Sequence, residues 1–293
     1  MHRALRPTPR PSPRRKPNGR PRFPKSLPPP SGKVRPFLYL PARVKYARTV
    51  RAFVASSRRL MDLDYRSFER RIATNPLVIV PVGALEAHGP HLPLGSDQIQ
   101  SEVTALALAE RVDALVAPTI PYGSAPGARR FPGTASLTIS QLETYTEGVL
   151  SELARSGVRR MLVLSGHGER GHMAALREAA DTVVRAHPGT RAVVLCDYEF
   201  VYEMRGNAAP ASDGHAGLLE TSRMIALAPE TVGTARPVVE YHHSPFVPGA
   251  PTEKDWPDAV IGDTRNANAE LGARVQAHVL DRLVETVRTL LPP

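Results

Sequence analysis

Residues 78–97 read Val-Ile-Val-Pro-Val-Gly-Ala-Leu-Glu-Ala-His-Gly-Pro-His-Leu-Pro-Leu-Gly-Ser-Asp, an apolar run followed by a loop of glycine, proline and polar side chains. The apolar run predicts a buried parallel strand, because strands covered on both faces are almost continuously apolar. Glu86 and His88 are two residues apart, so they point the same way in extended chain. With Asp97 they could hold a divalent metal, or two metals that share one carboxylate. The alternative is a polar loop in which Asp97 is the N-cap of the next helix.

Strand and helix patterns alternate along the rest of the chain. Strands are expected at 77–82, 114–118, 160–165 and 191–196, and helices at 99–112, 140–156, after 172 to 186, 214–228 and 266–291. In the second helix Ser140 is expected as the N-cap, with Glu143 completing a capping box. The alternation predicts an α/β fold with a mainly parallel central sheet covered by helices on both faces. Ligands of such sheets bind at the carboxyl ends of the strands.

Two further polar clusters follow predicted strands or begin predicted helices. His167 and Glu169 repeat the spacing of Glu86 and His88. Together with Asp97 they make five candidate ligands, too many for one tetrahedral zinc with an open position, but suitable for two divalent ions bridged by a carboxylate. Two such ions can polarise a carbonyl group and generate hydroxide from water near neutral pH.

The third cluster contains His215 and Glu220, near the start of a predicted helix. His215 could pass a proton to a leaving amine, and Glu220 could bind metal or orient another ligand. The alternative is that His215 caps the helix and Glu220 is a solvated helix position.

The charge of the chain is concentrated at its beginning. The 293 residues carry a net charge of +10, but residues 1–51 hold 15 Lys and Arg and no acid, which leaves 23 basic against 28 acidic residues in the remainder. We expect residues 1–60 to be a disordered tail rich in Pro and Arg, and the only contact with nucleic acid, if any, to come from it. An alternative is that translation begins at or near Met61, so that the tail is not part of the native protein.

Other bulk properties exclude several classes of protein. No apolar run reaches membrane-spanning length, and we expect a cytoplasmic protein that does not contact a membrane. The single cysteine, Cys196, excludes an internal disulfide and a cysteine-based zinc site, and its apolar surroundings predict a buried thiol.

Several motifs together resemble the creatininase (creatinine amidohydrolase) family. They are Glu86-x-His88-Gly-Pro-His-Leu-Pro with Asp97, residues 131–134 (Phe-Pro-Gly-Thr), Gly166-His167-Gly168 and His215-Ala-Gly-x-x-Glu220-Thr-Ser, and they occur in family order. The resemblance covers about residues 62–290. It implies a three-layer αβα domain, often a homo-oligomer, with two divalent ions that are zinc or manganese, with iron as a further option. It also implies that Glu86, His88, Asp97 (bridging), His167 and Glu169 bind metal and that His215 is the catalytic histidine.

The chain departs from parts of the family pattern. Many relatives have Gly-Gly-Asn after the second histidine, whereas this chain has Gly-Glu169-Arg170, as in the creatinine-hydrolysing branch. Glu169 is therefore a candidate both for metal binding and for catalysis, and Glu220 remains its rival as a ligand. Creatinine hydrolases enclose their substrate with tryptophans, but this chain has only Trp256. Arg170, with the two arginines at 129 and 130, could pair with an anionic substrate group or be solvated.

These observations predict a metal-dependent amidohydrolase in residues 61–293 that cleaves a non-peptide or cyclic amide C–N bond of a small molecule with metal-activated hydroxide. The alternatives are a formamide hydrolase, a peptidase that trims a small modified peptide in a biosynthetic pathway, and a non-catalytic metal-stabilised scaffold with a basic docking tail.

Overall fold

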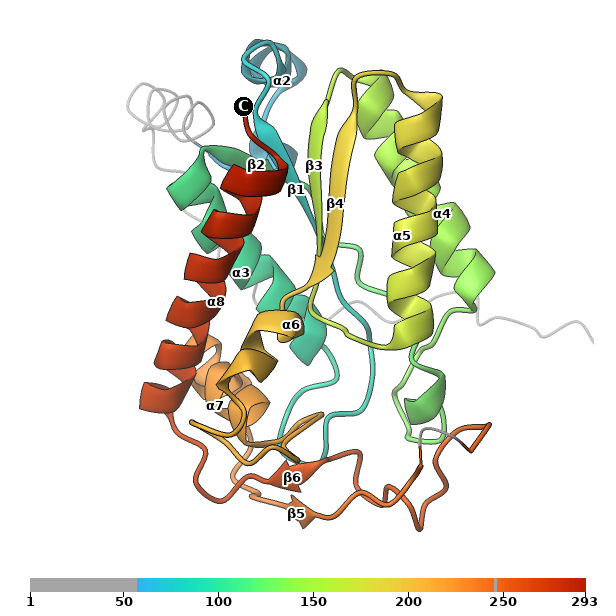
Figure 1. The fold of residues 1–293 in the computed structure, drawn as a ribbon, viewed down its shortest axis with the longest axis vertical. Coiled ribbons are helices and arrows are strands. Elements are labelled where there is room, and N and C mark those ends of the chain that lie inside the picture. Colours follow the sequence, from blue (N-terminus) through green and yellow to red (C-terminus); the bar gives the residue numbers. More distant parts are fainter. Residues whose placement is uncertain (1–56, 245–246) are drawn as a thin grey trace, which may run out of the picture. The chain divides into compact units, whose positions relative to one another are not determined.

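A four-stranded parallel sheet forms the centre of the protein in a computed structural model that describes residues 57–244 and 247–293 (Figure 1). The strand order is β2-β1-β3-β4, and the strands are β1 (Leu77–Val82), β2 (Ala114–Val116), β3 (Arg160–Ser165) and β4 (Arg191–Cys196). Val82, the last residue of β1, lies opposite Ser165, which in turn lies opposite Cys196. The ends of these three strands therefore lie level with one another at one edge of the sheet.

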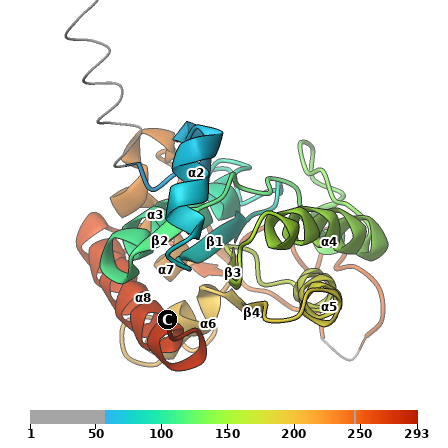
Figure 2. The same cartoon turned by 90° about the horizontal axis from the view of Figure 1, so that it is seen from above.

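Helices cover both faces of the sheet. On one side lie α3 (Ser96–Val112) and α8 (Ala269–Leu290), and on the other α4 (Ile139–Arg155) and α5 (Arg170–Ala186) (Figures 1 and 2). All six residues of β1 and of β3 are buried, as expected for central strands between two helix layers. The predicted three-layer α/β architecture with a parallel sheet is confirmed.

Shorter elements complete the described chain. Helix α7 packs against α8, and a two-stranded antiparallel ribbon joins residues 238–239 to residues 262–263. The elements are η1 (Leu60–Asp62), α2 (Tyr65–Ile72), η2 (Pro126–Ala128), α6 (Tyr198–Val201), η3 (Tyr202–Met204), α7 (Leu218–Leu227), η4 (Pro229–Thr231), β5 (Val238–Val239) and β6 (Gly262–Asp263).

All five predicted helices start at other residues than expected; α5 begins at Arg170 and α8 at Ala269. The N-cap of α4 lies two residues earlier than predicted, because Thr138 and Gln141, rather than Ser140 and Glu143, form the capping box. Helix α3 begins at Ser96, so Asp97 lies in its first turn instead of capping it. Helix α7 begins at Leu218 because Asp213 accepts the backbone N–H groups of Leu218 and Leu219 and holds the preceding residues in a turn.

The segment before Met61 contacts the sheet in the part that the structure describes. The backbone N–H of Val116 donates to the carbonyl oxygen of Arg58 over 2.7 Å, and the Arg59 guanidinium lies 2.6 Å from Glu102. These residues belong to the stretch 1–60 that we expected to be a disordered tail; residues 1–56 lie outside the described part of the chain.

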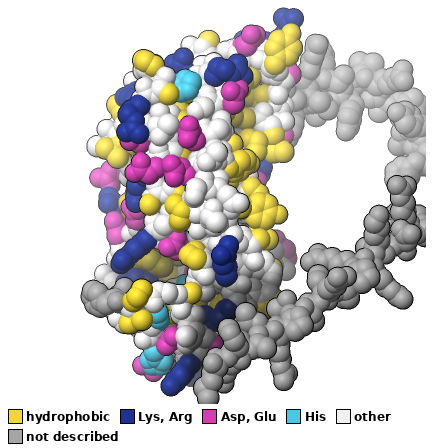
Figure 3. All heavy atoms as spheres, turned by 90° about the vertical axis from the view of Figure 1, so that its right-hand side faces the viewer, with side chains coloured by type: hydrophobic (Ala, Val, Ile, Leu, Met, Phe, Trp, Pro, Cys, Tyr) yellow, Lys and Arg dark blue, Asp and Glu magenta, His cyan; other side chains and the backbone are white. Residues whose placement is uncertain are grey.

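The outer surface of the α4 and α5 layer combines charged and apolar side chains (Figure 3). Hydrophobic side chains gather along one edge of this view, and Ile139 and Tyr145 are exposed hydrophobic residues of α4. Among the helices of the described residues, none combines the length and the apolar character needed to cross a bilayer.

Candidate metal centre

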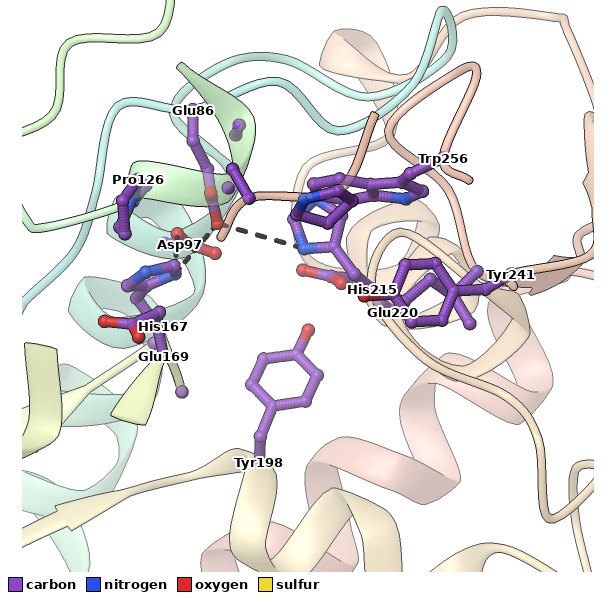
Figure 4. Close-up of a pocket in the computed structure, with 18 of the residues that line it drawn as sticks. Glu86, Asp97, Pro126, His167, Glu169, Tyr198, His215, Glu220, Tyr241 and Trp256 are labelled. Atoms are coloured by element: carbon purple, nitrogen blue, oxygen red, sulfur yellow. Dashed lines mark ion pairs between the residues drawn. The ribbon is translucent and has the colours of Figure 1, made fainter. Parts of the chain in front are cut away.

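Buried carboxylates and imidazoles converge where β1 and β3 end (Figure 4). Glu86 and His88 follow β1, Asp97 lies in the first turn of α3, and His167 follows β3. Glu220 joins them from the first turn of α7. Each of these five residues is at most 7% exposed. The parallel topology thus brings together residues from four separate segments of the chain.

Asp97 connects the two halves of this cluster. Its Oδ1 atom lies 3.0 Å from Nε2 of His88, and its Oδ2 atom lies 3.1 Å from Nδ1 of His167. Glu220 Oε1 lies 3.3 Å from the same atom of His88, and Glu86 Oε1 lies 2.8 Å from the same atom of His167. Two groups of three possible ligands therefore share Asp97, with one of its oxygens in each, and a third group joins Glu86, His88 and His215.

Backbone carbonyl groups fix which nitrogen each histidine presents. Nδ1 of His88 donates to the carbonyl oxygen of Glu86 at 3.0 Å, and Nε2 of His167 donates to the carbonyl oxygen of Ser124 at 3.0 Å. A carbonyl oxygen only accepts, so both of these nitrogens carry hydrogen. The opposite nitrogen of each ring faces Asp97 and is free to bind metal. Metal-binding histidines are usually oriented in this way.

The charges of the cluster stabilise one another. Burial raises the pKa of Asp97, but the His88 and His167 charges outweigh it and lower that pKa to about 2. Burial lowers the pKa of His88, whereas Asp97 and Glu220 raise it well above its ordinary value. The pKa of His167 is raised in the same way, against burial, by Glu86 and Asp97. The carboxylates therefore stay ionised, and a positive charge beside them is needed to stabilise them inside the protein.

The donor set fits two divalent cations. Glu86 Oε1 and Asp97 Oδ2 are buried without a hydrogen-bond donor in good geometry, which is costly unless another positive group binds them. Nitrogen and oxygen ligands without sulfur suit zinc or manganese. Glu86, Asp97 and His167 would hold one ion, and His88, Asp97 and Glu220 the other.

His215 lies at the rim of this cluster, before α7. Its Nε2–H donates to the carbonyl oxygen of Ala87 at 2.8 Å, so its Nδ1 faces Glu86 Oε1 at 3.8 Å. Two backbone hydrogen bonds join the turn around His215 to Ile261, which fixes the position of the ring. The ring also packs edge to face against Trp256, with centroids 5.2 Å apart. His215 is thus oriented toward the cluster and reaches the cavity beside it.

Glu169 occupies a different position from the five side chains above. It is the N-cap of α5, and its Oε2 accepts the backbone N–H of His172 at 2.7 Å. Its carboxylate belongs to none of the three-residue groups in the described structure, although it lines the cavity beside His167 (Figure 4). Glu220, the rival ligand, lies in the cluster, and Glu169 stays a prediction as a metal ligand and as a catalytic group.

A cavity of about 610 Å³ opens over the cluster. Its lining is largely apolar and includes the rings of Tyr198, Tyr241 and Trp256 (Figure 4). No lysine or arginine lines it among the described residues. Instead, Arg130 donates to the carbonyl groups of Pro251 and Trp256, which places it behind the wall.

Two further arginines and two further histidines lie outside the cavity wall. Arg129 donates to the carbonyl oxygen of Ser136, and Arg170 is exposed at the start of α5. His91 is buried and bonds Thr221 at 2.8 Å, and His172 is buried beside His167. The thiol of Cys196 is buried as predicted.

Several residues of the site were not predicted from the sequence. Gln100 donates to Glu220 Oε1 at 3.0 Å, and the Tyr198 hydroxyl donates to Gln100 at 2.8 Å. Gln100 could have been found, because it follows Asp97 by three residues on the same helix face. Nothing local in the sequence marks Tyr198 or Ser124, since only the tertiary fold brings them to the ligands.

The family model for creatininase (creatinine amidohydrolase) matches residues 61–287. The chain belongs to the creatininase family. It is 30% identical to a creatinine amidohydrolase of Pseudomonas putida over 79% of this chain and 96% of that protein. It is also 30% identical to a mycofactocin precursor peptide peptidase of Mycolicibacterium smegmatis, over 74% of this chain and 86% of the relative.

Solved creatininase structures share the fold. A manganese form superposes with a TM-score of 0.74 and 26% identity over 81% of this chain and all of that one, and a variant in a zinc–zinc form gives the same TM-score. The prediction of a creatininase-family, metal-dependent hydrolase acting on C–N bonds is confirmed.

Proposed function

We propose that this creatininase-family protein hydrolyses an amide C–N bond of a small molecule with two divalent ions held by Glu86, His88, Asp97, His167 and Glu220. The observation that carries the proposal is the carboxylate of Asp97, whose two oxygens face the ligand nitrogens of two different histidines at 3.0 and 3.1 Å. A bridging carboxylate of this kind is typical of two-metal hydrolytic sites. Bound zinc or manganese ions would polarise the amide carbonyl group and activate water.

Two residues at the cavity are candidates for transferring a proton to the leaving group. Nε2 of His215 is committed to the carbonyl oxygen of Ala87, so only Nδ1 can exchange a proton with the cavity. We assign to His215 the protonation of the departing nitrogen, which cannot leave readily as an anion. Glu169, at the same cavity wall, is the second candidate for proton transfer.

The cavity favours a substrate with a neutral or cationic, partly flat body. Its wall is aromatic and apolar, its four carboxylates all lie near the cluster, and no basic side chain lines it among the described residues. A cyclic amide fits this description and corresponds to the substrate named for the Pseudomonas relative. The volume of about 610 Å³ exceeds the needs of a single small ring, which favours as a second candidate a formamide or a short modified peptide.

The remaining predictions concern the context of the protein. We retain a homo-oligomer and a cytoplasmic location as proposals, and the exposed apolar residues of α4 offer a surface for subunit contact. The basic tail, as a docking segment for acidic partners or nucleic acid, falls within residues that the structure does not describe.

Metal analysis of the full-length protein tests the proposal. We expect close to two zinc, manganese or iron ions per chain, and turnover of at least one member of a panel of lactams, formamides and short peptides. Asp97→Asn should lose both ions and turnover, whereas Glu230→Gln, an exposed acid far along the chain, serves as the matched control. Wild-type protein that stays metal-free after soaking, or full turnover by Asp97→Asn, would refute the two-metal site.

A further inference from the structure

His172 is a buried histidine for which the proposed reaction has no role. It lies in the first turn of α5, is fully buried, and packs edge to face against the ring of His167 with centroids 4.8 Å apart. A second histidine so close to a metal-binding one would repel it if both were charged. The hydrogen bonds around His172 show how the protein avoids this and what the ring does instead.

The direction of each hydrogen bond of His172 follows from its partners. The backbone N–H of Ser124 donates to Nδ1 of His172 at 3.2 Å, so this nitrogen carries no hydrogen. Nε2 is then the N–H of a neutral ring, and it donates to Oγ of Ser165 at 3.0 Å. His172 is therefore held as one neutral tautomer by a backbone group on one side and a hydroxyl on the other.

Both partners of His172 also hold His167. The Ser165 hydroxyl donates to the carbonyl oxygen of His167 at 2.8 Å and accepts its backbone N–H at 3.0 Å. The carbonyl oxygen of Ser124 accepts Nε2–H of the His167 ring. These hydrogen bonds form a closed network. It runs from the imidazole of His167 to Ser124, then to His172 and Ser165, and back to the backbone of His167.

The loop that carries Gly123 and Ser124 packs closely against the imidazole of His172, so neither can move without the other. A Cβ atom at Gly123 would lie 2.8 Å from two atoms of the His172 ring and 2.8 Å from the carbonyl oxygen of Gly83. The loop that carries Ser124 therefore lies directly against the imidazole. A shift of His172 would move the Ser124 carbonyl group, and with it the acceptor that selects the tautomer of His167.

We propose that His172 is a positioning residue that aligns Nδ1 of His167 with the first metal site through Ser124 and Ser165. The inference rests on the proposed function, because it requires His167 to bind metal. It distinguishes the two sites: the ion held by Glu86, Asp97 and His167 depends on His172, whereas the ion held by His88, Asp97 and Glu220 does not.

Three substitutions test separately the hydrogen bond of His172 to Ser124 and its hydrogen bond to Ser165. His172→Phe removes both hydrogen bonds and keeps a ring in the space. In His172→Asn the side-chain oxygen replaces Nδ1 and still accepts from Ser124, and in His172→Gln the amide N–H replaces Nε2 and still donates to Ser165. His187→Phe, at the other end of α5, is the matched control because it removes a histidine from the same helix.

Metal affinity of the full-length proteins is measured by titrating zinc into chelated protein with a competing chelator, next to the melting temperature of the chelated forms. We expect His172→Phe to weaken one of the two ions by about 10- to 100-fold and to leave the other unchanged. His172→Asn should retain most of the affinity, because the Ser124 carbonyl contacts His167 directly, and His172→Gln should retain less.

Other outcomes overturn the inference. Two unchanged dissociation constants in His172→Phe, with only a lower melting temperature, would reduce His172 to a packing residue and leave the two-metal site intact. If His172→Phe does not fold, zinc affinities equal to wild type in both His172→Asn and His172→Gln would do the same. A wild-type protein that binds no zinc would overturn both the inference and the proposed function.

Discussion

Gln100 and Glu220 lie far apart in the chain, yet Nε2 of Gln100 donates to Oε1 of Glu220 across 3.0 Å. The Tyr198 hydroxyl fixes the orientation of the Gln100 amide by donating to its oxygen. The other oxygen of Glu220 accepts the backbone N–H of Ala216 at 2.7 Å. Both oxygens of this carboxylate are thus oriented before any ion binds, and Oε1 remains aimed at His88.

Gln100→Leu removes this support without a large change in volume. We expect the ion held by His88, Asp97 and Glu220 to bind about 10- to 100-fold more weakly, because a ligand that loses its orienting hydrogen bond binds metal less well. Competitive chelator titration measures the effect. Gln98→Leu, in the same helix, should leave both affinities unchanged; an equal loss in the two variants would contradict the assignment.

The number of bound ions per chain distinguishes Glu169 from Glu220 as a metal ligand. Glu220→Gln should lose one of two ions per chain, because its Oε1 faces His88. Glu169→Gln should keep both ions and lose turnover, and because its amide oxygen can still accept the backbone N–H of His172, α5 should keep its N-cap. Elemental analysis and thermal unfolding give these values. Two ions in Glu220→Gln and one in Glu169→Gln would reverse the assignment.

His215→Asn tests the proton donor. The side chain lies outside the two ligand groups that share Asp97, and its Nδ1 is 3.8 Å from Glu86, so the variant should retain both ions. We expect kcat to fall about 10²- to 10⁴-fold with little change in KM, which is the range for loss of general acid catalysis. Steady-state kinetics with a substrate found in the panel provides the measurement, and an unchanged kcat would exclude His215 as the donor.

The pH dependence of stability should differ between the chelated and the metal-loaded protein. In the chelated protein the raised pKa values of His88 and His167 give stabilisation that is complete below their ordinary value of 6.5 and lost as the pH rises through the folded values. The lowered pKa of Asp97 gives stabilisation that is present above 3.8 and lost as the pH falls toward about 2.

We therefore expect the chelated protein to melt at a lower temperature at about pH 9 than at about pH 6, because the imidazoles lose their protons while the carboxylates remain buried and charged. The loaded protein should show no such loss, since bound cations replace the protons. Thermal unfolding with and without chelator measures both. A chelated protein that gains stability between these two pH values would contradict the charge pairing in the cluster.

The buried ion pair of Arg223 and Asp197 is expected to contribute to the stability of the fold. The Arg223 guanidinium is fully buried, and its Nη2 lies 2.6 Å from Oδ2 of Asp197, which is also fully buried. Arg223→Met should cost about 3–5 kcal/mol of unfolding free energy, because it leaves Asp197 as a buried charge without a partner. Denaturant unfolding of the chelated protein measures this cost, with exposed Arg274→Met as the control. A loss below about 1 kcal/mol would contradict the argument.

The sequence predicted the sheet more closely than the ends of the helices. The bounds of β1, β3 and β4 agree with the prediction because their apolar runs are bounded by polar or turn residues. The start of α4 was wrong because Thr138 with Gln141 and Ser140 with Glu143 are equally good capping boxes in sequence. Only packing of the helix decides between them.

The candidate site was partly predictable for a physical reason. Ligands that follow parallel strands meet at one edge of a sheet, so Glu86, His88, Asp97 and His167 could be placed together from sequence spacing. Whether Glu169 or Glu220 is the metal ligand could not be decided from the sequence, because the position of the Glu169 carboxylate depends on where α5 begins. Once Arg170 begins that helix, the Glu169 carboxylate caps it.

The origin of the cluster in four separate segments has a consequence for folding kinetics. The ligands meet only after β1 and β3 have paired and α7 has docked, so the unfolded chain offers no comparable site to an ion. Ions that bind a site absent from the folding transition state stabilise the native state without speeding its formation. Metal should therefore slow the unfolding of this protein while leaving its rate of folding unchanged, and a loaded chain would persist long after its source of metal is withdrawn.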